Sequence, residues 1–103
     1  MSHNMTSQRR NVLWYVVEYQ EIHHFSPSYH EIMAHIDSLR EPNDPRHVST
    51  SSVGYHFQEL SRLGFMYYEP NVARGYAPTQ AGIELVKQWK TELEQENDHA
   101  SKF

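Results

Sequence analysis

A run of four hydroxyl side chains is the most suggestive chemical feature of this sequence. Ser49, Thr50, Ser51 and Ser52 stand at the start of an apolar repeat, and Tyr55 follows them. Short hydroxyl side chains at a helix start allow close approach to a DNA major groove and can hydrogen-bond base edges or phosphates. A phenol one turn later can contact a thymine methyl group or a phosphate. The alternative interpretation is a helix cap followed by ordinary exposed surface.

Several arginines could hold phosphate groups beside that run. Arg46 lies shortly before it, Arg62 lies near the end of the apolar repeat, and Arg74 lies at the start of the second segment of an expected hairpin, from which it could reach a phosphate or a minor groove. Arg9 and Arg10, near the chain start, are further candidates for phosphate contact. The alternative for each of them is a solvated arginine on an exposed face.

The overall charge opposes a simple nucleic-acid interpretation. The chain of 103 residues has a formal net charge of −4, divided equally between residues 1–80 and 81–103. Affinity for DNA comes largely from Lys and Arg on phosphates. A DNA contact would therefore use a local patch, and tight binding would need more than one copy of the chain.

Other chemistries find little support in the sequence. There are no cysteines, which excludes disulfides and thiolate ligands. The histidines do not form a His-x3-His pair, the spacing of His30 and His35 does not align on one helix face, and His56 is expected to be a packed core residue. No carboxylate pair stands beside a convincing nucleophile. We therefore expect no enzyme, cofactor or metal site.

The expected compartment is the cytoplasm. The sequence contains no run of about 18 apolar residues, and its first residues do not resemble a signal peptide. A soluble protein without a membrane partner is the interpretation that follows.

The first two elements that would position these residues are helices. Thr6 is a candidate N-cap for a helix that runs to about His23. Ser28 and Glu31 have the spacing of a capping box, which predicts a second helix opening at Tyr29. A polar, proline-containing stretch then follows.

A third helix and a hairpin are expected next. Ser49 is the N-cap candidate and Gly64 the stop, and the helix has an apolar stripe formed by Val53, Phe57, Leu60 and Leu63. Short aromatic segments at 65–68 and 74–77, separated by a turn, predict a β-hairpin. Thr79 would cap a last helix.

Three helices followed by a hairpin suggest a winged helix-turn-helix, and the residues also resemble a known family. Met5-Thr6 and the segment 26–32, Ser-Pro-Ser-Tyr-His-Glu-Ile, resemble the opening of LexA-type DNA-binding domains. Residues 49–60, Ser-Thr-Ser-Ser-Val-Gly-Tyr-His-Phe-Gln-Glu-Leu, with Leu63-Gly64-Phe65, resemble that family's recognition helix. Residues 74–76, Arg-Gly-Tyr, resemble its wing. The resemblance implies sequence-specific binding of double-stranded DNA through the third helix.

Two departures qualify this resemblance. The segment 37–48 is longer than the corresponding turn of the LexA pattern, and the self-cleaving domain of that family is absent. The junction at 78–82 is instead similar to that of MarR- and PadR-type regulators, which dimerise through terminal helices. The resemblance therefore implies a homodimer, for which an apolar stripe in the last helix supplies the candidates Leu85, Val86, Trp89 and Leu93.

The sequence thus predicts an α+β, mostly α, winged helix-turn-helix with a three-helix core, a hairpin wing and a C-terminal helix. The expected divisions are a DNA-binding domain at 5–78, a dimerisation helix at 79–97 and a frayed tail at 98–103. The expected function is transcriptional regulation, as a repressor. The alternative is a winged-helix module that contacts proteins and does not bind specific DNA.

Overall fold

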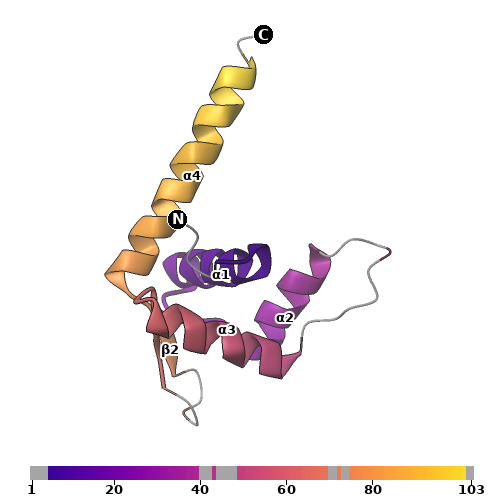
Figure 1. Ribbon diagram of the computed structural model, residues 1–103, viewed down its shortest axis with the longest axis vertical. Coiled ribbons are helices and arrows are strands. Elements are labelled where there is room, and N and C mark those ends of the chain that lie inside the picture. Colours follow the sequence, from indigo (N-terminus) through magenta and orange to yellow (C-terminus); the bar gives the residue numbers. More distant parts are fainter. Residues whose placement is uncertain (1–4, 40–42, 44–48, 70–71, 73–74, 102–103) are drawn as a thin grey trace.

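The computed structural model describes residues 5–39, 43, 49–69, 72 and 75–101, with side chains up to residue 95. Within these residues the fold is α+β and mostly helical, with four helices and one two-stranded antiparallel hairpin (Figure 1). The elements are α1 (Ser7–His23), α2 (Tyr29–Ser38), α3 (Thr50–Arg62), β1 (Met66–Tyr68), β2 (Tyr76–Pro78) and α4 (Gln80–Ser101). No helix among the described residues is long and apolar enough to span a membrane.

The predicted caps of α1 and α2 are confirmed. Thr6 Oγ1 accepts a hydrogen bond from the Arg9 amide at 3.1 Å. The Ser28 hydroxyl accepts from the Glu31 amide at 3.1 Å, and the Glu31 carboxylate accepts from the Ser28 amide at 2.7 Å. These bonds satisfy amides that a helix start otherwise leaves without a partner, so both helices begin where the sequence indicated.

Helices α1, α2 and α3 enclose one apolar core, which the hairpin and the start of α4 close. The ring of Phe57, fully buried, lies at its centre and contacts Tyr29, Tyr68 and Tyr76 with ring centroids 4.4–5.6 Å apart. The core residues are Val12, Leu13, Val16, Val17, Ile32, Ile36, Val53, Phe57, Leu60, Met66, Tyr76, Val86 and Trp89.

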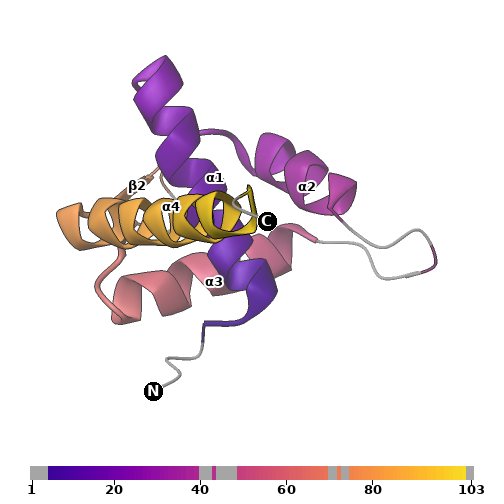
Figure 2. The same ribbon diagram turned by 90° about the horizontal axis from the view of Figure 1, so that it is seen from above.

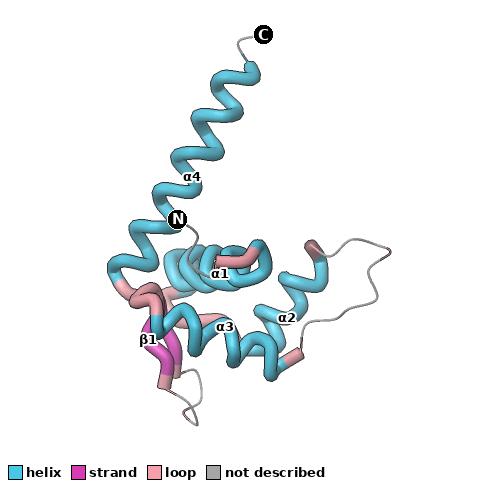
Figure 3. Tube along the Cα trace, in the orientation of Figure 1, coloured by secondary structure: helices cyan, strands magenta, loops and turns pink. Residues whose placement is uncertain are grey.

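The hairpin is anchored to the segment that joins α1 and α2. Its antiparallel register places Met66 opposite Pro78. The Ser26 hydroxyl donates to the Tyr76 carbonyl at 2.7 Å, and the Tyr76 hydroxyl donates to the Pro27 carbonyl at 2.6 Å. Strand β2 therefore pairs with β1 and is hydrogen-bonded to the α1–α2 segment. Figure 3 shows the two strands side by side in magenta.

Two element boundaries differ from the prediction. The second strand, expected over 74–77, occupies Tyr76–Pro78, and residues 73–74 lie outside the described part. Helix α4 continues to Ser101, so residues 98–101, expected to fray, are helical. The run from 92 to 96 is rich in Glu and Gln, which favour helix without needing a buried face.

Thr79 holds the start of α4 against the end of α3. Its hydroxyl accepts from the Gly82 amide at 3.1 Å, which confirms the predicted cap, and donates to the Gly64 carbonyl at 2.7 Å. A Cβ at Gly82 would clash with the carbonyl of Phe65. The absence of a side chain at Gly82 thus permits α4 to begin directly beside the α3–β1 turn.

Candidate nucleic-acid interface

The first turn of α3 is exposed and capped as predicted. The Ser49 hydroxyl accepts from the Ser52 amide at 3.1 Å. Ser49, Thr50 and Ser51 are exposed, and Ser52 is half-buried. The first turn of a helix carries a partial positive charge from its unsatisfied amides. The hydroxyl run therefore lies where both a phosphate and a base edge could be approached.

Helix α3 separates a buried face from an exposed one. Val53, Phe57 and Leu60 are fully buried. Tyr55 is 55% exposed, and it lies one turn after Ser51, so the two residues share one side of the helix. The apolar side chains of α3 thus hold this helix against the core. Ser51 and Tyr55 remain on its exposed side.

Arg62 is the last residue of α3 and forms an ion pair with Glu59. Its Nη2 and Nε donate to Glu59 Oε1 at 2.8 Å and 3.2 Å. This hydrogen bond, with the attraction between the two charges, raises the pKa of Arg62 and lowers that of Glu59. The Arg62 side chain is 55% exposed, and an ion pair so open to water contributes little to stability. A phosphate could replace the carboxylate at small cost.

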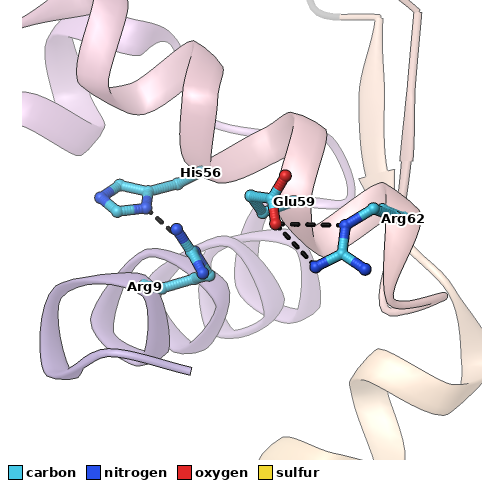
Figure 4. A network of polar contacts seen from close by, with 4 residues as sticks. All are labelled: Arg9, His56, Glu59 and Arg62. Atoms are coloured by element: carbon cyan, nitrogen blue, oxygen red, sulfur yellow. Dashed lines mark hydrogen bonds and ion pairs between the residues drawn. The ribbon is translucent and has the colours of Figure 1, made fainter. Parts of the chain in front are cut away.

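His56 is a packed, hydrogen-bonded histidine, as expected. It is 7% exposed, and its Nδ1 accepts from Arg9 Nε at 3.2 Å (Figure 4). That bond leaves the ring proton on Nε2, which lies 2.9 Å from Gln8 Oε1 and donates to it. Burial, followed by the charge of Arg9, lowers the pKa of His56 to about 4. The imidazole is therefore neutral at pH 7.

Arg9 is not the phosphate-binding surface residue suggested by the sequence. It is only 4% exposed, and its guanidinium carbon lies 5.4 Å from the centre of the Tyr55 ring. The sequence held a signal for this burial, because Arg9 precedes Val12, Leu13 and Val16 on the apolar stripe of α1. Arg9 therefore joins the buried side of α3, at His56, to its exposed side, at Tyr55.

The remaining arginine candidates do not gather beside α3 in the described structure. Arg10 is exposed, and its guanidinium carbon lies 4.6 Å from the centre of the Trp89 ring, against α4. Arg46 and Arg74 lie outside the described residues. Of the five arginine candidates, three lie among the described residues, and Arg62 is the one of these three that belongs to α3 and is exposed.

The apolar stripe of α4 is occupied mainly by the chain itself. Val86 and Trp89 are 1% and 9% exposed, and Trp89 stacks on Trp14 of α1. Leu85 is half-buried against the same core. The expectation that Trp89 needs a second subunit to cover it is wrong, because α1 leaves room for this ring beside Trp14. Leu93, 49% exposed, is the only one of the four predicted contacts that is largely open.

Comparison of the chain with protein-family models, with curated proteins and with solved structures finds no match. Among the described residues, no group of three or more His, Cys, Asp or Glu side chains could hold a metal ion. Function must therefore be argued from the geometry of α3 and its neighbours.

Proposed function

We propose that this protein is a sequence-specific, double-stranded DNA-binding transcriptional regulator of the winged helix-turn-helix type, acting as a repressor in the cytoplasm. The observation that carries the proposal is that α3 has one buried and one exposed side. One side is buried in the core, and the other presents an exposed hydroxyl run followed by Tyr55. A polar, rigidly seated helix of this kind is the element that such regulators place in the major groove.

Each part of the proposed interface has a distinct task. The hydroxyls of Ser49, Thr50 and Ser51 and the exposed amides of the first turn would bind phosphates and base edges. Tyr55 would contact a thymine methyl group or a phosphate one turn further along. Arg62, released from Glu59, would bind the backbone. Because the hairpin follows α3 directly, it would act as the wing.

The proposal includes a homodimer that binds a pseudo-palindromic duplex. The chain carries a net charge of −4, so one copy can make only a few favourable phosphate contacts. Joining two half-site contacts raises the effective concentration of the second without additional Lys or Arg. Leu93 and the exposed turn around it, residues 91–95, supply the surface for this contact.

Selection from a random duplex pool tests the proposal. The full chain, at low salt, should enrich duplexes that share a motif with two related half-sites. Competition by unlabelled selected and scrambled duplexes would then measure the specificity. If repeated rounds enriched no motif, the proposed function would be wrong.

An interaction module that binds protein is the second candidate, and one observation favours it. Ile22 and Phe25, at the C-terminal end of α1, are 71% and 51% exposed. This end of α1 lies on the opposite side of the molecule from α3 (Figure 2). Large apolar side chains that are exposed in one region of the chain can mark a protein contact. Failure to enrich any duplex would favour this function.

A further inference from the structure

Gln8 and Arg9, in the first turn of α1, both contact His56 in the middle of α3, and Arg9 also reaches Tyr55. Arg9 donates from Nε to His56 Nδ1 at 3.2 Å, while its guanidinium carbon lies 5.4 Å from the centre of the Tyr55 ring. Adjacent residues on a helix point in different directions. Arg9 therefore contacts both the residue that α3 turns inward and the residue that it turns outward.

His56 and the Tyr55 ring can each hold the Arg9 guanidinium in one place. The neutral His56 offers one acceptor nitrogen to Arg9, and its other ring nitrogen donates to Gln8. A ring centre within about 6 Å of a guanidinium attracts the positive charge. Because Arg9 is almost completely buried, it has little freedom to follow movements of the Tyr55 ring. The buried Arg9 therefore restrains the position of the exposed Tyr55 ring more than the ring restrains Arg9.

An exposed tyrosine would otherwise exchange among staggered side-chain rotamers. Tyr55 is 55% exposed, and the described contacts of its ring are with Arg9 and with the neighbouring His56 ring. An aromatic contact to a base requires one position of the ring. The entropic cost of ordering the Tyr55 ring on binding is lower if the unbound protein already populates that position.

Arg9 also adds positive charge behind the exposed face of α3. The hydrogen bond from Arg62 lowers the pKa of Glu59, and the charges of Arg62 and Arg9 act in the same direction. With Arg9, two cations act on the single carboxylate of Glu59. The charge of Arg9 thus acts together with that of Arg62 to favour the ionised form of Glu59.

We infer that Arg9 is a positioning residue for the proposed DNA-reading surface. From its buried place beside His56, Arg9 holds the Tyr55 ring in one orientation. The part of this inference that concerns DNA rests on the proposed function. The ordering of Tyr55 does not, and it can be measured in the unbound protein.

The primary test compares Arg9→Met with the unaltered chain. Met keeps an apolar stem and removes the charge and the donor. Three-bond Hα–Hβ couplings of Tyr55, measured by NMR, should change from those of one rotamer to averaged values. Lys87→Met is the matched control, because it removes one positive charge from an exposed position on α4 and should leave the Tyr55 couplings unchanged.

A second variant covers the possibility that Arg9→Met does not fold. Loss of Arg9 leaves the buried acceptor of His56 without its partner, which is destabilising. The double variant Arg9→Met/His56→Leu removes donor and acceptor together, and the partner that remains, Gln8, is exposed. Tyr55 should be averaged in this variant as well. A Tyr55 that kept one rotamer in folded Arg9→Met or in the double variant would overturn the inference.

The second measurement uses a selected and a random duplex. Arg9→Met should reduce the ratio of the two affinities about two- to ten-fold, in the lower part of the range of coupling between neighbouring residues. Combined with Tyr55→Ala, it should cause no further loss of this ratio. Additive losses would show that Arg9 acts independently of Tyr55 and would overturn the positioning role. If Tyr55 became averaged but no variant bound any duplex selectively, the proposed function would fail while the Arg9–Tyr55 arrangement would stand.

Discussion

The indole rings of Trp14 and Trp89 stack with their centroids 5.9 Å apart and their planes inclined by 26°. The guanidinium carbon of Arg10, also from α1, lies 4.6 Å from the centre of the Trp89 ring. Beside them, Lys90 Nζ forms an ion pair with Glu18 at 2.8 Å. The first half of α4 is therefore part of the folded domain, even though the sequence suggested a separate dimerisation element.

Replacement of Trp89 should measure how strongly α4 is attached. We expect Trp89→Ala to lower the free energy of unfolding by about 3–5 kcal/mol, because it removes a large buried ring and leaves a cavity beside Trp14. Urea denaturation followed by circular dichroism would measure the change. Lys87→Ala, at an exposed position of the same helix outside the proposed dimer contact, should alter stability by no more than about 0.5 kcal/mol. Equal effects would contradict the assignment of Trp89 to the core.

The exposed half of α4 should control self-association. Light scattering at tens of micromolar should find a dimer for the full chain and a monomer for a chain that ends at residue 90. The shortened chain retains Trp89 and Lys90, so its folded domain should survive. A monomeric full chain, or a dimeric shortened one, would remove α4 from the assembly.

The hydroxyl run and Tyr55 should matter for selectivity more than for general affinity. Tyr55→Ala or Ser51→Ala should weaken binding to a selected duplex by about 1–3 kcal/mol and binding to a random duplex much less. Ile22→Ala, at an exposed position at the opposite end of the molecule, is the control. Equal weakening on both duplexes would assign the two residues to phosphate contacts.

The buried His56 should make the fold sensitive to acid. Its pKa is lowered from 6.5 to about 4 in the folded state, so the unfolded chain binds the proton more readily between these values. Its contribution to stability is therefore complete above about pH 6.5 and is lost as the pH falls toward 4. Between pH 7.5 and 5 this loss should be about 1–2 kcal/mol.

Urea denaturation at several pH values would measure this slope. His56→Gln removes the titrating ring and keeps an acceptor for Arg9, so its slope should be shallower. Gln58→Ala removes an exposed, non-titrating side chain from the same helix and should keep the original slope. A His56→Gln variant as acid-sensitive as the unaltered chain would place the effect elsewhere.

Local patterns predicted the parts of the fold that depend on neighbouring residues. The caps at Thr6, Ser28 and Ser49 rest on bonds to residues three positions along the chain, and all three are confirmed. The buried stripe of α3 follows in the same way from a helical period. Ser49, Thr50, Ser51 and Tyr55 are therefore exposed as predicted, with Ser52 at the border of the buried stripe.

Long-range pairs could not be predicted in this way. Arg9 is buried because His56 accepts its hydrogen bond, and Trp89 is buried because Trp14 stacks on it. Neither partner is near in sequence. The apolar stripe of α1 indicated that Arg9 is buried but not what accepts its hydrogen bond, and nothing in the sequence indicated that Trp14 covers Trp89. The two residues whose environments were misjudged are both fixed by contacts between helices.

The part of α4 that extends beyond the body in Figure 1 also sets a length scale. A helix rises about 5.4 Å per turn, so sliding the contact between two copies by one turn would change the span of the assembly in steps of that order. Half-sites read by a two-fold dimer recur about 34–36 Å apart along a duplex. The spacing between half-sites in selected duplexes would thus show where along α4 the two copies are in contact.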